Sequence, residues 1–167
     1  MSNRRLGTVI LTIALAIGAA GAGAQAPASL PGLTGIRSKA EIDALVARLR
    51  SGALKGAQPL FEQEHGTYRV YTSYIDHRKG LADIHVDDDE IFVVLSGAAQ
   101  CTLGGDIANK TLGPGPARDY HGTEIVGGVT RAIAEGDVVS APRGTAHQMD
   151  AGTGHILYIV IKIIGKS

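Results

Sequence analysis

Two histidines and two carboxylates in short, strand-like segments are the side chains of this sequence best suited to chemistry. The first segment, LADIHVDDDEIFVVLSG, contains Asp83, His85 and Glu90. Asp83 and His85 are two residues apart, so an extended strand places both on one face. We expect Asp87–Asp89 to form a solvent-facing turn of a hairpin, which would bring Glu90 close to both. Because imidazole and carboxylate groups suit first-row divalent metals, this segment is a candidate half of a metal site.

A second segment, GDVVSAPRGTAHQM, supplies another histidine between two turn signals. Gly136 lies in a turn, a strand-like run reaches Ala141, and residues 142–144 (Pro-Arg-Gly) reverse the chain. The next strand then begins with His147, whose imidazole is a further metal-ligand candidate. The sequence therefore predicts that His147 joins the side chains of the first segment.

Together the two segments resemble the two sequence motifs of the cupin superfamily. The first motif is Gly, five residues, His-x-His, three or four residues, Glu, six residues and Gly. The second is Gly, five residues, Pro-x-Gly, two residues, His, three residues and Asn. The positions that match are His85, Glu90 and Gly97 in the first motif and Gly136, Pro142, Gly144 and His147 in the second. The positions that depart are His77, Asp83 and Ala151, where the motifs have Gly, His and Asn.

The resemblance implies an all-β fold, namely a single cupin barrel of the jelly-roll (double-stranded β-helix) type. It also implies a divalent transition metal, which could be Fe, Mn, Zn, Ni or Cu, held by His85, Glu90 and His147. Asp83 stands in place of the family's first histidine and is a chemically plausible fourth ligand. Cupins often pair through barrel edges, so the resemblance also implies a possible homodimer.

Two function hypotheses from different classes follow from this ligand set. Two imidazoles and one carboxylate serve both Fe(II) oxygen chemistry and zinc hydrolysis, so a metal-dependent enzyme acting on a small molecule is the first. Its reaction (oxygenase, isomerase or lyase type) and its catalytic residues stay open. The alternative is a barrel that binds a small molecule without turnover, and a purely structural barrel is a third reading. Tyr120 and His121, in a loop-rich segment, are weaker candidates for lining the substrate pocket.

The rest of the chain supplies the elements that must position these residues. SKAEIDALVARLRSG predicts one short helix, because Ser38 and Glu41 form a capping box and apolar residues recur at helical spacing before Gly52. From Gly66 onward, short β-rich runs alternate with Gly, Asp and Pro, which is typical of a sandwich or small barrel. We therefore predict a linker and short helix over residues 25–55 and the cupin barrel over residues 56–167.

The N-terminal segment MSNRRLGTVILTIALAIGAAGAGAQA combines two arginines, a short apolar core and small residues. This pattern predicts a signal peptide over residues 1–24, and hence a periplasmic or secreted protein with no membrane association after cleavage. The alternative is an uncleaved anchor, for which the apolar core is short.

Composition narrows the partners further. The 16 basic and 16 acidic side chains cancel, so no electrostatic footprint for nucleic acid is present. Cys101 is the single cysteine and lies in an apolar strand-like run, where we expect it to be a small buried hydrophobe.

Overall fold

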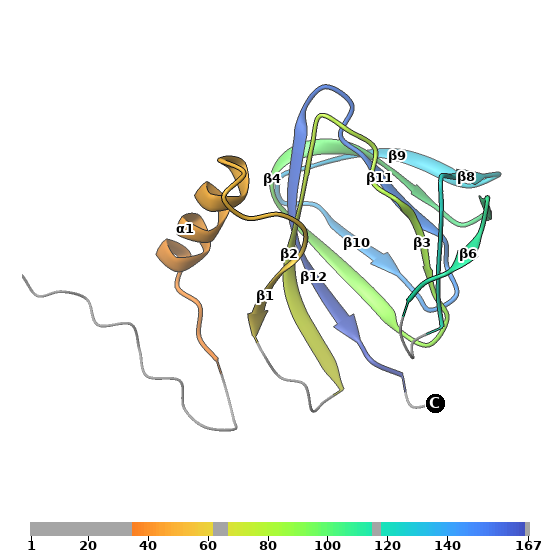
Figure 1. Ribbon diagram of the computed structural model, residues 1–167, viewed down its shortest axis with the longest axis horizontal. Helices are drawn as coiled ribbons and strands as arrows, with labels where there is room; N and C mark the ends of the chain where they lie inside the picture. The colour runs from red at the N-terminus through yellow and green to blue at the C-terminus, as the bar shows by residue number, and fades with distance from the viewer. Residues whose placement is uncertain (1–34, 62–66, 115–117, 166–167) are drawn as a thin grey trace, which may run out of the picture. The chain divides into compact units, whose positions relative to one another are not determined.

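A computed structural model describes residues 35–61, 67–114 and 118–165 (Figure 1). The predicted signal peptide lies outside these residues, and so does most of the predicted linker. No helix in the described ranges is both long and apolar enough to cross a membrane.

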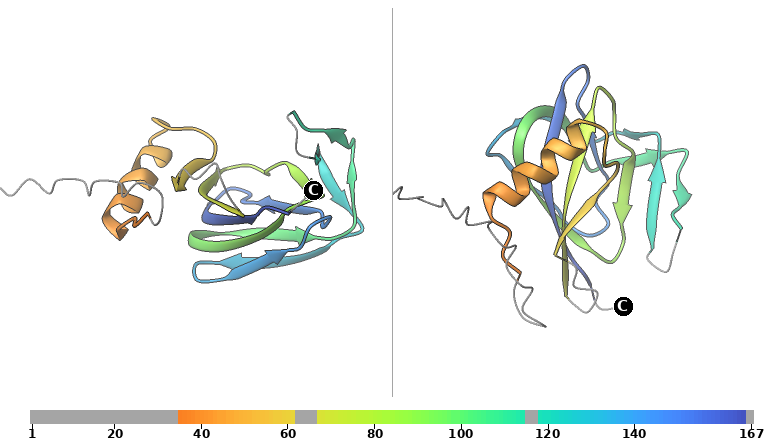
Figure 2. Two further views of the ribbon diagram at one scale, coloured as in Figure 1. Left: turned by 90° about the horizontal axis from the view of Figure 1, so that it is seen from below. Right: turned by 60° about the vertical axis from the view of Figure 1, so that its left-hand side comes forward.

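The predicted helix is confirmed as α1 (Lys39–Arg50). The Ser38 hydroxyl accepts a hydrogen bond from the Glu41 backbone N–H, and the Glu41 carboxylate accepts one from the Ser38 N–H, so the capping box is complete. On its buried side, Val46 and Leu49 pack against Leu157 of the barrel. The helix therefore covers the outside of the barrel, away from its interior (Figure 2).

The described strands follow α1 in chain order. Their bounds are β1 (Gln58–Phe61), β2 (Tyr68–Asp76), β3 (Ala82–His85), β4 (Asp89–Leu103), β5 (Asp106–Ala108), β6 (Thr111–Leu112), β7 (Asp119–Gly122), β8 (Glu124–Val126), β9 (Val129–Ala134), β10 (Val138–Ala141), β11 (His147–Asp150) and β12 (His155–Ile163). The main sheet runs β1-β2-β12-β4-β11-β3-β7-β6, with β9 and β10 also paired to β4, and every pairing is antiparallel. This pattern confirms the predicted all-β jelly-roll barrel.

Strand β4 is long enough to belong to both halves of the barrel. Its first part pairs with β10 and β12, and its second part pairs with β9 and β11. Gly97 lies where the pairing changes and has φ of 80°. A Cβ atom at this position would lie 2.0 Å from the backbone oxygen of His155, so only glycine allows β12 to approach here.

The interior between the two halves is apolar over most of its length. Phe92, Val94, Met149, Tyr158 and Val160 belong to one buried cluster that spans β4, β11 and β12. Successive residues of a strand point to opposite faces, so the alternation in β4 and β12 places these side chains inward.

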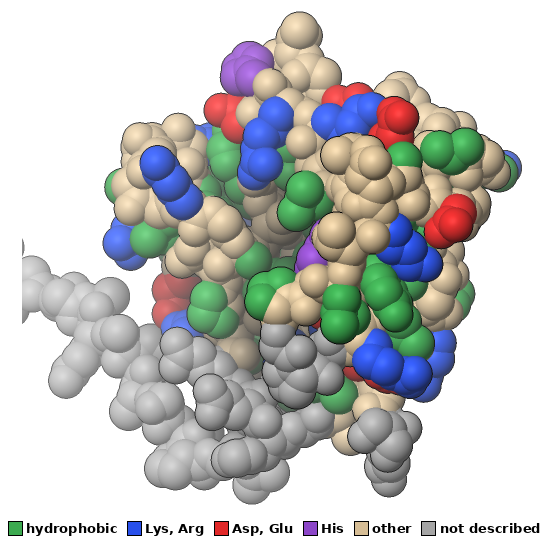
Figure 3. All heavy atoms as spheres, turned by 45° about the vertical axis from the view of Figure 1, so that its right-hand side comes forward, with side chains coloured by type: hydrophobic (Ala, Val, Ile, Leu, Met, Phe, Trp, Pro, Cys, Tyr) green, Lys and Arg blue, Asp and Glu red, His purple; other side chains and the backbone are tan. Residues whose placement is uncertain are grey.

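In the loop-rich segment of residues 104–128, which we expected to be mainly loop, the described residues contain four short strands, β5 to β8. β7 pairs with β3 and extends the barrel sheet, whereas β5 and β8 form a separate two-stranded sheet. Apolar side chains stay exposed there, including Leu112 and Val126. Figure 3 shows hydrophobic side chains lying among Lys and Arg side chains on this side of the molecule. The sequence pattern did not predict these strands because each run has only two to four residues, and Gly residues precede β5, end β7 and follow β6 and β8.

Candidate metal centre

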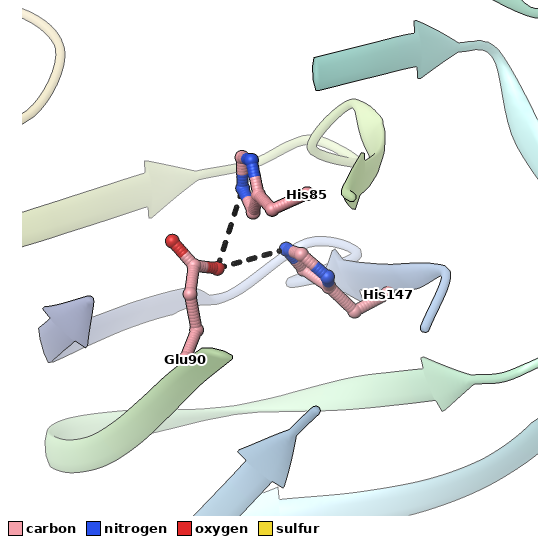
Figure 4. Close-up of side chains that lie close together, drawn as sticks. All are labelled: His85, Glu90 and His147. Carbon is pink, nitrogen blue, oxygen red and sulfur yellow. Dashed lines mark ion pairs between the residues drawn. The ribbon is translucent and has the colours of Figure 1, made fainter. Parts of the chain in front are cut away.

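Three side chains from three strands meet inside the barrel (Figure 4). His85 ends β3, Glu90 lies near the start of β4, and His147 begins β11. The Glu90 Oε2 atom lies 3.4 Å from His85 Nε2 and 3.2 Å from His147 Nε2. One ligand atom from each residue lies within 4.8 Å of the other two, which is a spacing that a single metal ion can bridge. The sequence-predicted residues His85, Glu90 and His147 are therefore brought together in space.

The route by which they meet differs from the expected hairpin. Among the described strands, β3 pairs with β7 and β11, and no ladder joins β3 to β4. Residues 86–88 instead cross from one half of the barrel to the other, so His85 and Glu90 face each other across the interior. β11 pairs with both β3 and β4, which places His147 beside them.

Both histidines are oriented by their outer ring nitrogen. His85 Nδ1 lies 2.7 Å from a carboxylate oxygen of Asp119 on β7. His147 Nδ1 lies 3.3 Å from the backbone oxygen of Thr145. Because these oxygens accept hydrogen bonds, each Nδ1 carries a proton, so that loss of the Nε2 proton toward Glu90 would leave the Nε2 lone pair facing the shared centre. This is the tautomer that a metal ligand requires.

Glu90 is held in a comparable way. Its Oε1 accepts a hydrogen bond of 2.9 Å from the Tyr71 hydroxyl and lies 3.4 Å from Lys162 Nζ. Its Oε2 is thereby left for the histidines. Only 2% of Glu90 is exposed. Burial by itself raises the pKa of Glu90, but the hydrogen bond with His147 and the neighbouring positive charges outweigh it, and the pKa falls to about 2. The carboxylate is therefore ionised at neutral pH.

The acids before Glu90 are not a solvated turn, as we had expected. Each of Asp87–Asp89 forms an ion pair with a different distant segment, and the partners are Arg118, Lys162 and Arg143, respectively. These pairs fix the segment that crosses between the two halves of the barrel, and thus the approach of Glu90. Sequence spacing could not reveal them, because Arg118 lies 31 residues from Asp87, Arg143 lies 54 residues from Asp89, and Lys162 lies on the distant strand β12.

The remaining predicted residues lie outside the three-residue cluster. Asp83 accepts a hydrogen bond of 2.5 Å from His121 Nδ1, and its role as a fourth ligand stays a prediction. Tyr120 packs against a separate apolar cluster that includes Ala82 and Ile107. Neither Tyr120 nor His121 is among the described residues that line the cavity, so their pocket role also stays a prediction.

Asp119 is the functional candidate that the sequence reading missed. It lies directly before Tyr120 and His121, yet nothing in its spacing links it to His85. The link depends on the register of β3 with β7, which places Asp119 opposite His85. The signal available in the sequence was a carboxylate two residues before His121, a suspected pocket histidine.

A cavity of about 350 Å³ leads to the three residues. Its described lining comprises Ala57, Tyr71, Ser73, Ile75, Arg78, Gly80, Leu81, Asp83, His85, Glu90, Phe92, His147, Gln148, Met149, Tyr158 and Val160. Ala57, Arg78 and Leu81 are exposed, whereas Glu90 and His147 are buried. The cavity therefore opens at the exposed residues and ends at the candidate metal centre.

No protein-family model matches the chain, and no curated protein matches it by sequence. Among solved structures, a protein of Klebsiella pneumoniae with a double-stranded β-helix domain is 13% identical, with 66% of this chain and 79% of that chain covered and a TM-score of 0.47. A cupin-2 domain from Rhodospirillum rubrum is 15% identical, with coverage of 66% and 60% and a TM-score of 0.47. The cupin domain of Cnp3 from Schizosaccharomyces pombe is 12% identical, with coverage of 65% and 63% and a TM-score of 0.47.

These TM-scores are below 0.5, so the fold assignment rests on the strand pairing of this chain and on the position of its motif residues. The strands of the antiparallel barrel enclose His85, Glu90 and His147, and Gly97 lies at the bend of the long strand β4. The chain has a cupin-type fold. Within that fold, the two cupin motifs supply the three clustered side chains, while the replaced histidine position, Asp83, is paired with His121.

Proposed function

We propose that this chain is an exported cupin that binds a divalent transition metal and acts on a small molecule inside its barrel. The observation that carries the proposal is the convergence of His85 Nε2, His147 Nε2 and Glu90 Oε2, each with its other polar atom already bonded. Such a donor set suits Fe, Mn, Zn, Ni or Cu and leaves coordination positions open for a ligand.

When bound, the metal would supply Lewis acidity or redox chemistry to a molecule in the cavity. The chain's own residues supply the rest. Asp119 and the Thr145 carbonyl hold the imidazole tautomers, and Tyr71 with Lys162 holds the Glu90 carboxylate. The apolar wall lowers the local dielectric and excludes water around the small molecule. Oxygenase, isomerase and lyase reactions are all compatible with this arrangement.

Binding of a small molecule without turnover is the second candidate function. The two tyrosines that line the cavity favour it, because neither is suited to act as a general base. Burial raises the pKa of Tyr158 to about 12, and burial together with Glu90 raises the pKa of Tyr71 well above its usual range. Neither phenol can therefore serve as a base at neutral pH. Asp83, which is bonded to His121, is then the remaining candidate base among the described lining residues. If Asp83→Asn abolishes turnover and leaves the metal content unchanged, the enzyme function is favoured. If the unmodified protein turns over no tested class of small molecule, the binding function is favoured.

Export and pairing belong to the same proposal. Residues 1–24 would direct the chain out of the cytoplasm and be removed, and two copies would pair through barrel edges. N-terminal sequencing of the exported protein tests the first expectation, and its mass in solution tests the second.

The proposal is tested by elemental mass spectrometry on the mature chain purified without chelator or affinity nickel. We expect about one transition metal per chain. His85→Ala and His147→Ala should each abolish it, whereas His155→Ala should not, because His155 contacts Arg50 and Tyr74 outside the cavity. Metal retained by both ligand variants, or a folded wild-type chain that takes up none of the five metals, would contradict the proposal.

A further inference from the structure

An arginine at the mouth of the cavity indicates the chemical class of its ligand. Arg78 lies between β2 and β3, is exposed, and lines the cavity together with Leu81. In the described part of the chain its guanidinium forms no ion pair, whereas the adjacent Lys79 pairs with Asp150. The cavity entrance therefore has a guanidinium that is available to a ligand.

The inner end of the cavity is also positive once a metal is bound. A divalent cation with two neutral imidazoles and the Glu90 carboxylate has a net charge of about +1. The other lining carboxylate, Asp83, is hydrogen-bonded to His121, and even with its negative charge counted the metal-loaded centre and Arg78 leave the lining with a net charge of about +1. Between the two ends, Ile75, Phe92 and Met149 supply apolar wall. A ligand that complements this cavity is negatively charged and has an apolar body.

We infer that the cavity binds a small organic acid whose carboxylate pairs with Arg78. The planar guanidinium presents two parallel N–H donors that match the two oxygens of a carboxylate. The body of the acid lies against the apolar wall, and an oxygen at its other end faces His85, Glu90 and His147. A cavity of about 350 Å³ limits the ligand to a small molecule. This inference rests on the proposed function, because it names the ligand class of the same site.

The test compares acids with their uncharged amides. Binding of succinate, glutarate and adipate, each beside its uncharged diamide, is measured by calorimetry on the metal-loaded full chain. Arg78→Met removes the guanidinium, and Lys79→Met is the matched control, since it removes the same charge from the next residue outside the described lining. The backbone oxygen of Arg78, which accepts from the Ala151 N–H, is kept in both variants.

We expect at least one acid to bind more tightly than its amide. Arg78→Met should lower the affinity for that acid by about tenfold or more, as expected for the loss of a charge-assisted hydrogen bond. Lys79→Met should change its affinity less than about twofold, as expected for a screened surface charge. No preference for any acid, or an equal loss in both variants, would overturn the inference.

Metal content, measured on the same samples, separates this inference from the proposed function. An Arg78-dependent preference in a chain that takes up no metal would uphold the acid-binding site and contradict the metal site. A metal-loaded chain without that preference would uphold the metal site and contradict the acid-binding site.

Discussion

Asp119 should control how tightly the candidate centre holds its metal, although it does not touch the metal itself. Its carboxylate accepts a 2.7 Å hydrogen bond from His85 Nδ1, with exposed fractions of 11% for the His85 side chain and 23% for Asp119. Because the pair is largely shielded from solvent, the bond keeps most of its electrostatic strength. Asp119→Asn removes the charge, and the new amide can donate to Nδ1 and so favour the tautomer whose Nε2 carries the proton.

The magnitude follows from the bond that is lost. A hydrogen bond to a charged group contributes about 1.5–3 kcal/mol, which corresponds to roughly 10- to 100-fold in an equilibrium constant. The same range is typical when a carboxylate behind a metal-bound histidine is removed. We therefore expect Asp119→Asn to weaken metal binding by about 10- to 100-fold without displacing the metal from the site.

The assay is competition against a chromophoric chelator, with the same metal for every variant. Asp106→Asn is the matched control, since Asp106 is an exposed acid of the same region that pairs with Lys110 and touches no ligand. Thermal unfolding of the metal-free variants verifies that the barrel is intact. If Asp119→Asn folds normally and binds metal within about twofold of the wild type, the outer hydrogen bond does not tune the centre and the reasoning is wrong.

Three predictions concern the scaffold. Ser38→Ala should lower the free energy of unfolding by about 1 kcal/mol by removing the helix cap, and an unchanged urea midpoint would contradict the role of the cap. Ile156→Ala, at a fully buried position, should cost about 2–5 kcal/mol, whereas Ile36→Ala, at an exposed one, should cost less than about 0.5 kcal/mol in the same measurement. Burial raises the pKa of Cys101 to about 11, so iodoacetamide at pH 8 should react about a hundredfold or more slowly with the folded chain than with the unfolded one; comparable rates would show that the thiol is accessible.

Local signals in the sequence were sufficient for the helix, for most strands outside residues 104–128 and for the identity of the clustered side chains. The capping box gave α1, and the change to period two gave the strands. Turn residues at fixed spacing placed His147 at the start of a strand. Gly97, matched only as a motif position, proved necessary because β12 approaches it too closely for a side chain.

What the sequence could not supply was pairing between distant segments. The expected hairpin was wrong because β3 joins β7 and β11 rather than β4, and register of this kind depends on the whole sheet. The ion pairs of Asp87–Asp89 and the bond from His85 to Asp119 depend on the same long-range order. The sequence thus indicated which side chains form the candidate cluster, whereas the fold showed what holds them in place.

Anomalous diffraction from metal-loaded crystals, recorded on both sides of the absorption edge of the bound metal, tests the central claim most directly. The account predicts one peak inside the barrel, within about 2.0–2.3 Å of His85 Nε2, His147 Nε2 and Glu90 Oε2. A peak on the Asp83–His121 pair instead, or no peak in the barrel of a chain that binds metal in solution, would contradict it.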